Sequence, residues 1–343
     1  MDLTFILPVR NRRQWMRRAA DSCLQNHQPC FNVQLLILDG HSTDGTWEEL
    51  VAAYGTDCRV KLLRQGTEAG FMGACFQAIP LVGTPWATFM YDDDVLSPYW
   101  HLLARRVELS GMSFGMGLGV KSPVNKLSNF RAPQKWVRIA PSDLLRGYSD
   151  AAKWWRPDWL PVSPICCLTQ TEFLREWANA VRIFSAQNQF RQEYLIRRAA
   201  GPDLMVYLLS LLRSQGHVAV LRAPIAQFSE HDETISGSSG EDELALGYWL
   251  ARVWLAHQLK REARPEATAW AGWACHRALL LLRDRWKLGR FHPSLAILRE
   301  FMLMRSLFQG EELNSWRAHF LKRFIPRSMR IPEPVRAETV DLS

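Results

Sequence analysis

The chain lacks the sequence features that mark several protein classes. It has no run of about 18 uncharged apolar residues, so we expect no membrane-spanning helix. Residues 1–4 lack the basic and apolar parts of a signal peptide. No Gly-x-Gly-x-x-Gly motif follows the first apolar segment, which argues against a nicotinamide-dependent dehydrogenase. The seven cysteines form no Cys-x-x-Cys pair and no metal-ligand spacing, so we expect reduced, buried thiols and a cytoplasmic protein.

The composition is that of a globular protein with an excess of positive charge. Of the 343 residues, 48% are hydrophobic and 22% are charged, which suits a chain with a sizeable core. The formal net charge of +8 favours an acidic partner, such as nucleotide phosphates or an anionic membrane surface, unless the surplus arginine only maintains solubility. No nucleic-acid-binding module is recognisable, so we expect no nucleic-acid partner.

Apolar segments alternate with helical patterns in the N-terminal part of the chain. Strands are expected at residues 3–9, 33–38, 60–63 and 87–91, and helices at residues 13–25, 47–54 and 70–80. The alternation predicts right-handed crossovers and a parallel sheet, and the continuously apolar strands predict that helices cover both faces. We therefore expect an α/β fold with a Rossmann-like, mostly parallel sheet flanked by helices.

Polar side chains stand at the ends of several of these strands. Arg10 follows the first strand, Asp39 ends the second, and Asp92, Asp93 and Asp94 follow the fourth. Because ligands bind at the carboxyl ends of parallel strands, we expect one site at this edge of the sheet. Adjacent carboxylates repel one another unless a cation neutralises them, so the triplet favours Mg²⁺ or Mn²⁺ held together with a phosphate-bearing ligand. An exposed acidic turn is the alternative.

The order and spacing of these motifs resemble family 2 glycosyltransferases of the GT-A fold. The matching segments are LPVRN at residues 7–11, LDGHSTDGT at residues 38–46 and YDDDVLSP at residues 91–98. The resemblance implies an inverting, metal-dependent transfer of a sugar from a nucleotide-diphosphate sugar, with a UDP-sugar favoured. The acceptor would be a hydroxyl of a saccharide or lipid-linked molecule in cell-surface polysaccharide or glycolipid synthesis.

The same resemblance implies roles for individual residues. It implies donor binding by Pro8, Val9, Arg10, Asp39, Gly70 and Asp92, and metal binding by Asp93, Asp94 and His231. Asp93 matches the family's metal ligand and Asp92 its ribose contact. Tyr91 replaces the first acid of the usual motif, and Cys75 and Phe76 replace an Arg-Asn pair common in the family. These departures keep open the alternative of a non-catalytic glycosyltransferase-like binding protein.

Asp203 resembles the catalytic base of the family. It begins an apolar helix that is followed by Gly216 and a strand at residues 217–221. An inverting transfer needs one carboxylate to take the acceptor's proton, whereas a glycoside hydrolase needs a second acid for its leaving group. A capping role at the start of the helix is the alternative.

The chain is expected to divide into three parts, with boundaries at residues 240 and 325. We expect a catalytic domain at residues 1–240, a helical subdomain at residues 241–325 and a flexible tail at residues 326–343. The aromatic segment 154–161 is either an acceptor-binding wall or a packed loop, and the Ser-Gly-rich segment 236–240 is either a lid or a linker. The basic C-terminal helices, expected at residues 244–259, 267–286, 293–308 and 316–324, leave open a peripheral contact with the inner face of the membrane.

Overall fold

The computed structural model describes residues 1–66, 70–133, 135–149, 160–161, 163–231, 241–287, 294–307 and 338–341. The chain divides into two compact units. The first unit contains Met1–Arg182, Val206–Ser239 and Arg336–Ser343, and the second contains Ile183–Met205 and Gly240–Val335. Residues 183–205 thus group with the C-terminal helices, and the domain boundaries expected at residues 240 and 325 stay predictions.

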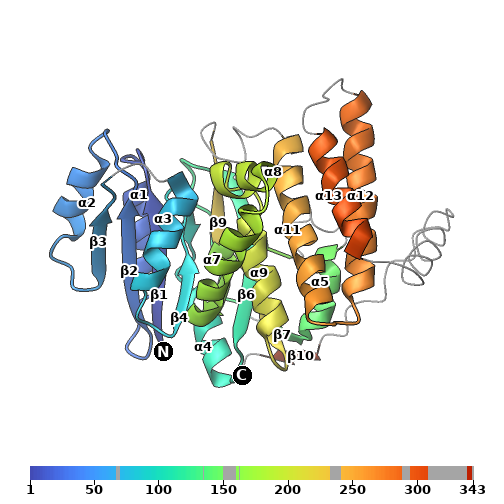
Figure 1. Cartoon of the computed structure of the whole chain (residues 1–343). Helices are drawn as coiled ribbons and strands as arrows, with labels where there is room; N and C mark the ends of the chain where they lie inside the picture. Colours follow the sequence, from blue (N-terminus) through green and yellow to red (C-terminus); the bar gives the residue numbers. More distant parts are fainter. Residues whose placement is uncertain are drawn as a thin grey trace. The chain divides into compact units, whose positions relative to one another are not determined.

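A single mixed sheet organises the first unit (Figure 1). The strand order is β10-β7-β9-β6-β8-β4-β1-β2-β3, and β5 pairs with β9. The strands are β1 (Asp2–Val9), β2 (Asn32–Asp39), β3 (Val60–Arg64), β4 (Trp86–Phe89), β5 (Val95–Leu96), β6 (Phe114–Pro123), β7 (Lys135–Ile139), β8 (Cys167–Gln170), β9 (Val218–Glu230) and β10 (Glu338–Asp341).

The parallel part of the sheet lies where the sequence predicts it. β1 pairs in parallel with β2 and with β4, and β2 pairs in parallel with β3. Beyond β4 the sheet becomes mixed, because β8 is antiparallel to both β4 and β6, and β7 is antiparallel to β9. Glu338–Asp341 forms β10 against β7, and the flexible tail expected at residues 326–343 stays a prediction. Pro164–Cys166 forms a 3-10 turn directly before β8.

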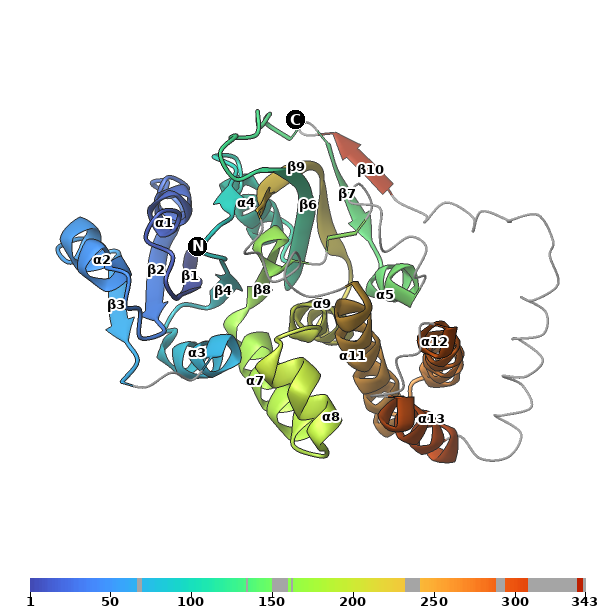
Figure 2. The same ribbon diagram turned by 90° about the horizontal axis from the view of Figure 1, so that it is seen from above.

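Helices cover both faces of the sheet (Figure 2). The helices are α1 (Met16–Leu24), α2 (Thr46–Tyr54), α3 (Gly70–Ala78), α4 (His101–Leu109), α5 (Pro141–Ser149), α7 (Thr171–Ser185), α8 (Gln189–Gln192), α9 (Pro202–Arg213), α11 (Glu241–Arg261), α12 (Ala267–Lys287) and α13 (Ser294–Leu307), with a short π-helical turn at Glu193–Arg197. In Figure 2, α1, α2 and α4 lie on one face and α3 and α7 on the other.

Buried side chains on both faces explain the uninterrupted apolar strands. On one face, the Phe5 ring of β1 contacts Trp100, with ring centroids 5.0 Å apart. On the other, the Trp177 ring of α7 packs against Phe89 of β4 at 5.3 Å and Phe76 of α3 at 6.2 Å. A strand covered on both sides gains from apolar residues at every position, so alternation disappears.

The second unit is helical. α12 packs against both α11 and α13, and the Trp249 indole N–H of α11 donates a hydrogen bond of 2.9 Å to the Ala274 carbonyl of α12. Arg191 and Glu300, both about 1% exposed, form an ion pair of 2.6 Å that joins α8 to α13. Among the described helices, none combines the length and apolarity needed to cross a bilayer. The expected helix 316–324, the segment 236–240 and most of the aromatic segment 154–161 lie outside the described residues.

Candidate functional site

The ends of β1, β2 and β4 bring the predicted polar residues to one edge of the sheet. Val9 pairs with Asp39 at the ends of β1 and β2. After β4, the Met90 backbone N–H donates a hydrogen bond of 2.8 Å to the Ile6 carbonyl, which keeps the chain beside β1 up to the acidic triplet. The register therefore places Arg10, Asp39 and the triplet at the carboxyl ends of adjacent strands.

The loops after β1 and β2 hold each other in a fixed conformation. Asn11 and His41 have positive φ angles of 51° and 65°, which residues other than glycine rarely adopt. The Asn11 backbone N–H donates to Ser42 Oγ, and Asn11 Oδ1 accepts from the Thr43 N–H, both at 2.9 Å. A Cβ atom on Gly40 would lie 3.3 Å from Arg10 Cβ, so a glycine lets the two loops approach closely. Backbone strain held by local contacts is typical of binding sites.

Asp92 is tied to the loop after β1. It accepts a hydrogen bond from the Arg10 backbone N–H, and its Oδ1 lies 3.6 Å from Arg12 Nε. Burial, and then the charge of Asp93, raise the pKa of Asp92 to about 7. The carboxyl group is 20% exposed, so a ligand can still reach it.

Asp93 faces a histidine from the end of β9. Asp93 Oδ2 lies 2.9 Å from His231 Nε2, and the Trp15 ring lies 4.1 Å from the His231 ring. Arg18 of α1 donates a hydrogen bond of 2.8 Å to the Asp93 backbone carbonyl and one of 3.1 Å to Ser229 Oγ. The structure thus brings together residues separated by more than a hundred positions in the sequence.

Asp94 is turned into the protein. Its Oδ1 accepts a hydrogen bond of 2.9 Å from the Ser229 backbone N–H, and the residue is 7% exposed. Burial, followed by the charge of Asp93, raises the pKa of Asp94 well above its usual value. Its assignment as a metal ligand stays a prediction, and its observed contact is with β9.

The pair Asp93 and His231 offers suitable donor atoms for a divalent cation. Among the residues that the structure describes, no group of three or more His, Cys, Asp and Glu side chains is arranged to hold a metal. A carboxylate oxygen and an imidazole nitrogen 2.9 Å apart nevertheless suit Mn²⁺, whose remaining positions a phosphate-bearing ligand could fill. The residues present therefore fit a cation held jointly by protein and ligand.

Gly70, the remaining residue predicted to bind the donor, lies at the start of α3. Gly70 has a φ of 66° and is exposed at the first position of α3. The next residue, Phe71, packs its ring 5.8 Å from the Tyr91 ring. Cys75 is fully buried and its pKa is raised by burial, so its side chain belongs to the core and offers no replacement for the family's arginine.

Asp203, the predicted base, lies in the second unit. Its Oδ2 accepts a hydrogen bond of 2.8 Å from the Tyr248 hydroxyl of α11, and its Oδ1 accepts one of 2.8 Å from the Leu204 N–H. Burial raises the pKa of Asp203 to about 6, while the Tyr248 hydroxyl opposes that shift. Gly201 has a φ of 99°, and a Cβ there would lie 2.3 Å from the Gly247 carbonyl, so these glycines allow the close approach that sets Tyr248 beside the carboxylate.

Comparison with known proteins identifies the N-terminal part of the chain. Residues 4–162 match the Glycosyl transferase family 2 profile. The chain carries a family 2 glycosyltransferase domain. The expected enzyme class, a glycosyltransferase, is thereby confirmed. A search of the curated proteins finds no match.

Solved structures of Staphylococcus aureus TarS are similar to this glycosyltransferase in fold. TarS 1-349 in complex with UDP-GlcNAc gives a TM-score of 0.60 at 13% identity, covering 89% of this chain and 79% of that chain. A second TarS structure gives a TM-score of 0.58 at 12% identity, covering 94% of this chain and 54% of that chain. The expected GT-A fold, with its C-terminal helical region, is confirmed.

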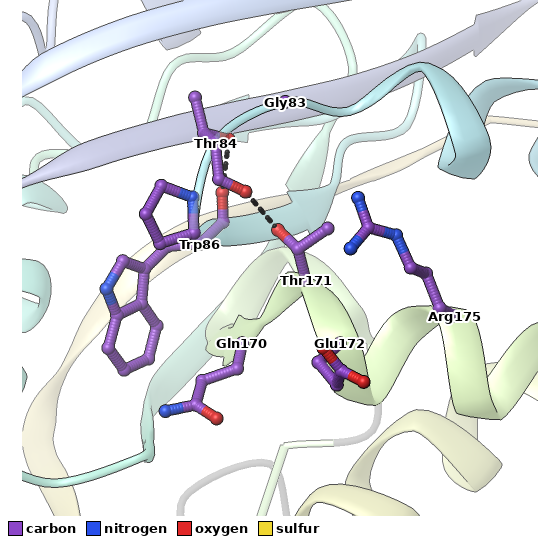
Figure 3. Close-up of a pocket in the computed structure, with 8 residues that line it drawn as sticks. Gly83, Thr84, Trp86, Gln170, Thr171, Glu172 and Arg175 are labelled. Atoms are coloured by element: carbon purple, nitrogen blue, oxygen red, sulfur yellow. Dashed lines mark hydrogen bonds between the residues drawn. The ribbon is translucent and has the colours of Figure 1, made fainter.

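The glycosyltransferase also has a pocket of about 360 Å³ away from the acidic triplet (Figure 3). It is lined by Gly83, Thr84, Pro85, Trp86, Gln170, Thr171, Glu172 and Arg175. Trp86 begins β4, so the pocket lies at the opposite end of this strand from the triplet. The Thr171 hydroxyl donates to the Thr84 carbonyl at 2.7 Å, and the Thr84 hydroxyl to the Trp86 carbonyl at 2.8 Å. No predicted site residue lines this pocket, so it is not the candidate site.

Sequence reasoning missed several residues of this glycosyltransferase site. Arg18 and Trp15 lie on and before α1, where their spacing indicates only a helix, and Tyr248 lies in the middle of a long helical pattern. Their positions depend on contacts between distant segments, so no local pattern could have identified them.

Proposed function

We propose that the protein is a metal-dependent, inverting glycosyltransferase that moves a sugar from a UDP-sugar to an acceptor hydroxyl. The observation that carries this proposal is the Asp93–His231 pair at the carboxyl edge of a family 2 glycosyltransferase domain. The likeness in fold to TarS in complex with UDP-GlcNAc supports a uridine nucleotide as the donor.

The donor would occupy the edge formed by the ends of β1, β2 and β4. Asp39, whose side chain is fully buried at the end of β2, would contact the nucleobase together with the Pro8, Val9 and Arg10 segment. Asp92 would contact the ribose, and the exposed Gly70 would allow the diphosphate or sugar to pass close to the start of α3. A positive-φ glycine without a side chain suits such an approach.

Asp203 would act as the general base. The acceptor oxygen attacks the anomeric carbon, its proton passes to the Asp203 carboxylate, and the bond from the anomeric carbon to the diphosphate oxygen breaks with inversion. A pKa of about 6 leaves this carboxylate ionised at neutral pH while keeping it basic enough to accept a proton. Asp93 and His231 would hold Mn²⁺ or Mg²⁺, which supplies charge stabilisation for the departing diphosphate.

The acceptor and setting follow from the family resemblance. A saccharide or lipid-linked acceptor in cell-surface polysaccharide or glycolipid synthesis is our proposal, with the protein in the cytoplasm or at the inner face of the membrane. The second candidate, a non-catalytic nucleotide-sugar binder, is favoured by the buried Cys75, because the family's arginine has no equivalent there.

Calorimetric titration with UDP, GDP and dTDP, with and without Mn²⁺, tests the donor site. We expect UDP to bind tightly only with the metal, and Asp93→Ala to abolish that metal dependence. Asp57→Ala is a matched control, because Asp57 bonds Arg59 in the loop before β3, and it should leave UDP binding unchanged. Metal-dependent UDP binding that survives in Asp93→Ala would refute the site.

Turnover separates the two candidate functions. In Asp203→Asn we expect UDP release from a UDP-sugar to fall by about 100-fold or more, while the affinity for UDP stays the same. A wild-type protein that binds UDP-sugars without any turnover would instead support the non-catalytic binder.

A further inference from the structure

Arg18 of α1 connects three segments of the first unit that are far apart in the sequence. Its Nη2 donates hydrogen bonds of 2.8 Å to the Asp93 carbonyl and 3.1 Å to Ser229 Oγ, and its Nη1 donates to the Val124 carbonyl. A guanidinium group is planar and carries five N–H donors at fixed angles, so one arginine can bind several acceptors at once. Arg18 thus joins the acidic triplet, the end of β9 and the chain that directly follows β6.

Two of these segments carry the pair Asp93 and His231. Arg18 bonds the backbone of Asp93 itself, and Ser229 stands two residues before His231 in the chain. The pair lies 138 residues apart in the sequence, yet Asp93 Oδ2 and His231 Nε2 are 2.9 Å apart. A shift of either backbone segment would change this distance. The Arg18 bond goes to the Asp93 carbonyl, which leaves the carboxylate facing His231.

A second contact joins the same two segments. The Ser229 N–H donates a hydrogen bond of 2.9 Å to Asp94 Oδ1. Two links restrict the relative position of two chain segments more than one link does. The bonds of Arg18 are the part of this junction that a substitution can remove while all three acids of the triplet stay in place.

The position of Arg18 has a cost. The side chain is partly buried, and burial lowers the pKa of Arg18, while the charges of Asp93 and Asp94 oppose that shift. A positive charge near Asp93 would by itself repel a divalent cation there. An arginine at this place must therefore contribute something that offsets the repulsion. The hydrogen bonds that fix both segments are such a contribution.

We propose that Arg18 is a positioning residue, which holds the Asp93 carboxylate and the His231 imidazole in the arrangement that a divalent cation and the donor diphosphate require. This inference rests on the proposed function, because it requires the cation at Asp93 and His231. Arg18 acts through the backbone of Asp93 and through Ser229, and it contacts neither the cation nor the donor.

The test is calorimetric titration of the full chain with UDP, with and without Mn²⁺. We call the gain in UDP affinity on addition of Mn²⁺ the metal increment. Loss of a group that orients a metal ligand typically lowers metal affinity 10- to 100-fold, so Arg18→Met should reduce the metal increment about tenfold or more. The UDP affinity without Mn²⁺ should stay the same. Arg17→Met, at the adjacent and exposed position of α1, is the matched control and should keep the wild-type metal increment.

Ser229→Ala tests one bond of Arg18 with a smaller change. It removes the Oγ acceptor and keeps the backbone N–H that bonds Asp94. We expect the metal increment to fall about threefold, as for the loss of a single hydrogen bond. In the Arg18→Met background the same substitution should have no further effect, because the bond is already absent. Two fully additive effects would refute the link. Should Arg18→Met fail to fold, Ser229→Ala decides the question.

Two more variants separate positioning from charge and from stability. Arg18→Lys keeps the positive charge, but an ammonium group lacks the fork that reaches all three acceptors, so its metal increment should fall nearly as far as in Arg18→Met. Tyr54→Phe removes a hydrogen bond of 2.7 Å from Tyr54 to Asp21 of α1, away from the triplet. It should lower the Tm and leave the metal increment unchanged.

The outcomes separate this inference from the proposed function. If UDP binding to the wild-type protein does not depend on Mn²⁺, both fail. If Asp93→Ala abolishes the metal increment and Arg18→Met keeps or raises it, the role of Arg18 is refuted while the proposed site stands. An Arg18→Met variant that loses UDP affinity equally with and without Mn²⁺ would indicate a general structural role and would also refute the positioning role.

Discussion

Replacement of Tyr248 by phenylalanine should move the pH dependence of catalysis. The Tyr248 hydroxyl donates a hydrogen bond of 2.8 Å to Asp203 Oδ2, and this bond favours the ionised carboxylate. A hydrogen bond to a charged group contributes roughly 1.5–3 kcal/mol, and one pKa unit corresponds to about 1.4 kcal/mol. Because Asp203 is only half-buried, we take the lower end of this range and expect its pKa to rise by about one unit, from about 6 to about 7.

The assay is UDP release from a UDP-sugar, with kcat/KM measured across the acid range. Below its pKa the Asp203 carboxyl group carries a proton and cannot accept another, so activity is lost as the pH falls through that value. The kcat/KM of the wild-type protein should decline below about pH 6, and that of Tyr248→Phe below about pH 7. At a pH well above both values, the substitution should change kcat/KM little.

A second tyrosine provides the control. The Tyr54 hydroxyl donates a hydrogen bond of 2.7 Å to Asp21 Oδ1 within the first unit, so Tyr54→Phe also removes a tyrosine–carboxylate bond. That variant should lose some stability and keep the wild-type pH profile. An unmoved acid limb in Tyr248→Phe, or an equal shift in Tyr54→Phe, would contradict the role of Asp203 as the base under the influence of Tyr248.

Two further predictions concern the stability of the folded chain. Glu300→Ala leaves the buried Arg191 cation without its carboxylate and should lower the free energy of unfolding by about 3–5 kcal/mol, measured by thermal or denaturant unfolding. Glu176→Ala removes the partially exposed partner of Arg213 and should lower it by less than about 1 kcal/mol. Equal losses of stability in Glu300→Ala and Glu176→Ala would contradict the expectation that an ion pair matters more when it is buried. Burial lowers the pKa of His257 to about 4, so the folded state binds fewer protons than the unfolded chain between about pH 4 and 6.5. Stability should therefore fall as the pH drops from 7 to 5, by roughly 2 kcal/mol from this residue, and His257→Phe should remove that part of the pH dependence.

The parallel half of the fold could be predicted because each strand carries its own signal. The continuous apolar segments end at Arg10, Asp39 and Asp92. The pairing of Val9 with Asp39 and the hydrogen bond from Met90 N–H to the Ile6 carbonyl show that these ends lie at one edge. The antiparallel strands were harder to predict. β6 contains Gly115, Gly117 and Gly119, at which a Cβ would lie less than 3.0 Å from neighbouring side chains, so packing requirements replaced the apolar pattern that marks a strand.

The association of residues 183–205 with the C-terminal helices could not be predicted from local patterns. It depends on the buried pair of Arg191 and Glu300, whose members are 109 residues apart, and on the close contact of Gly201 with Gly247. In the sequence, Arg191 and Glu300 look like ordinary charged surface residues. Gly201 and Gly247 look like glycines that merely interrupt a helix. The same limit applies to Tyr248, whose significance appears only beside Asp203.

The three aspartates of the acidic triplet have the same side chain but different contacts in the folded chain. Asp94 accepts from the Ser229 N–H and is buried against β9, and Asp92 is joined to the loop after β1 through the Arg10 N–H. These contacts fix the backbone on both sides of Asp93, whose side chain is left facing His231 at 2.9 Å. A metal ligand needs such a fixed position, because a loosely held carboxylate loses binding energy to ordering. The sequence predicts the charge of the triplet, but only the folded chain shows that Asp92 and Asp94 accept backbone hydrogen bonds while Asp93 faces His231.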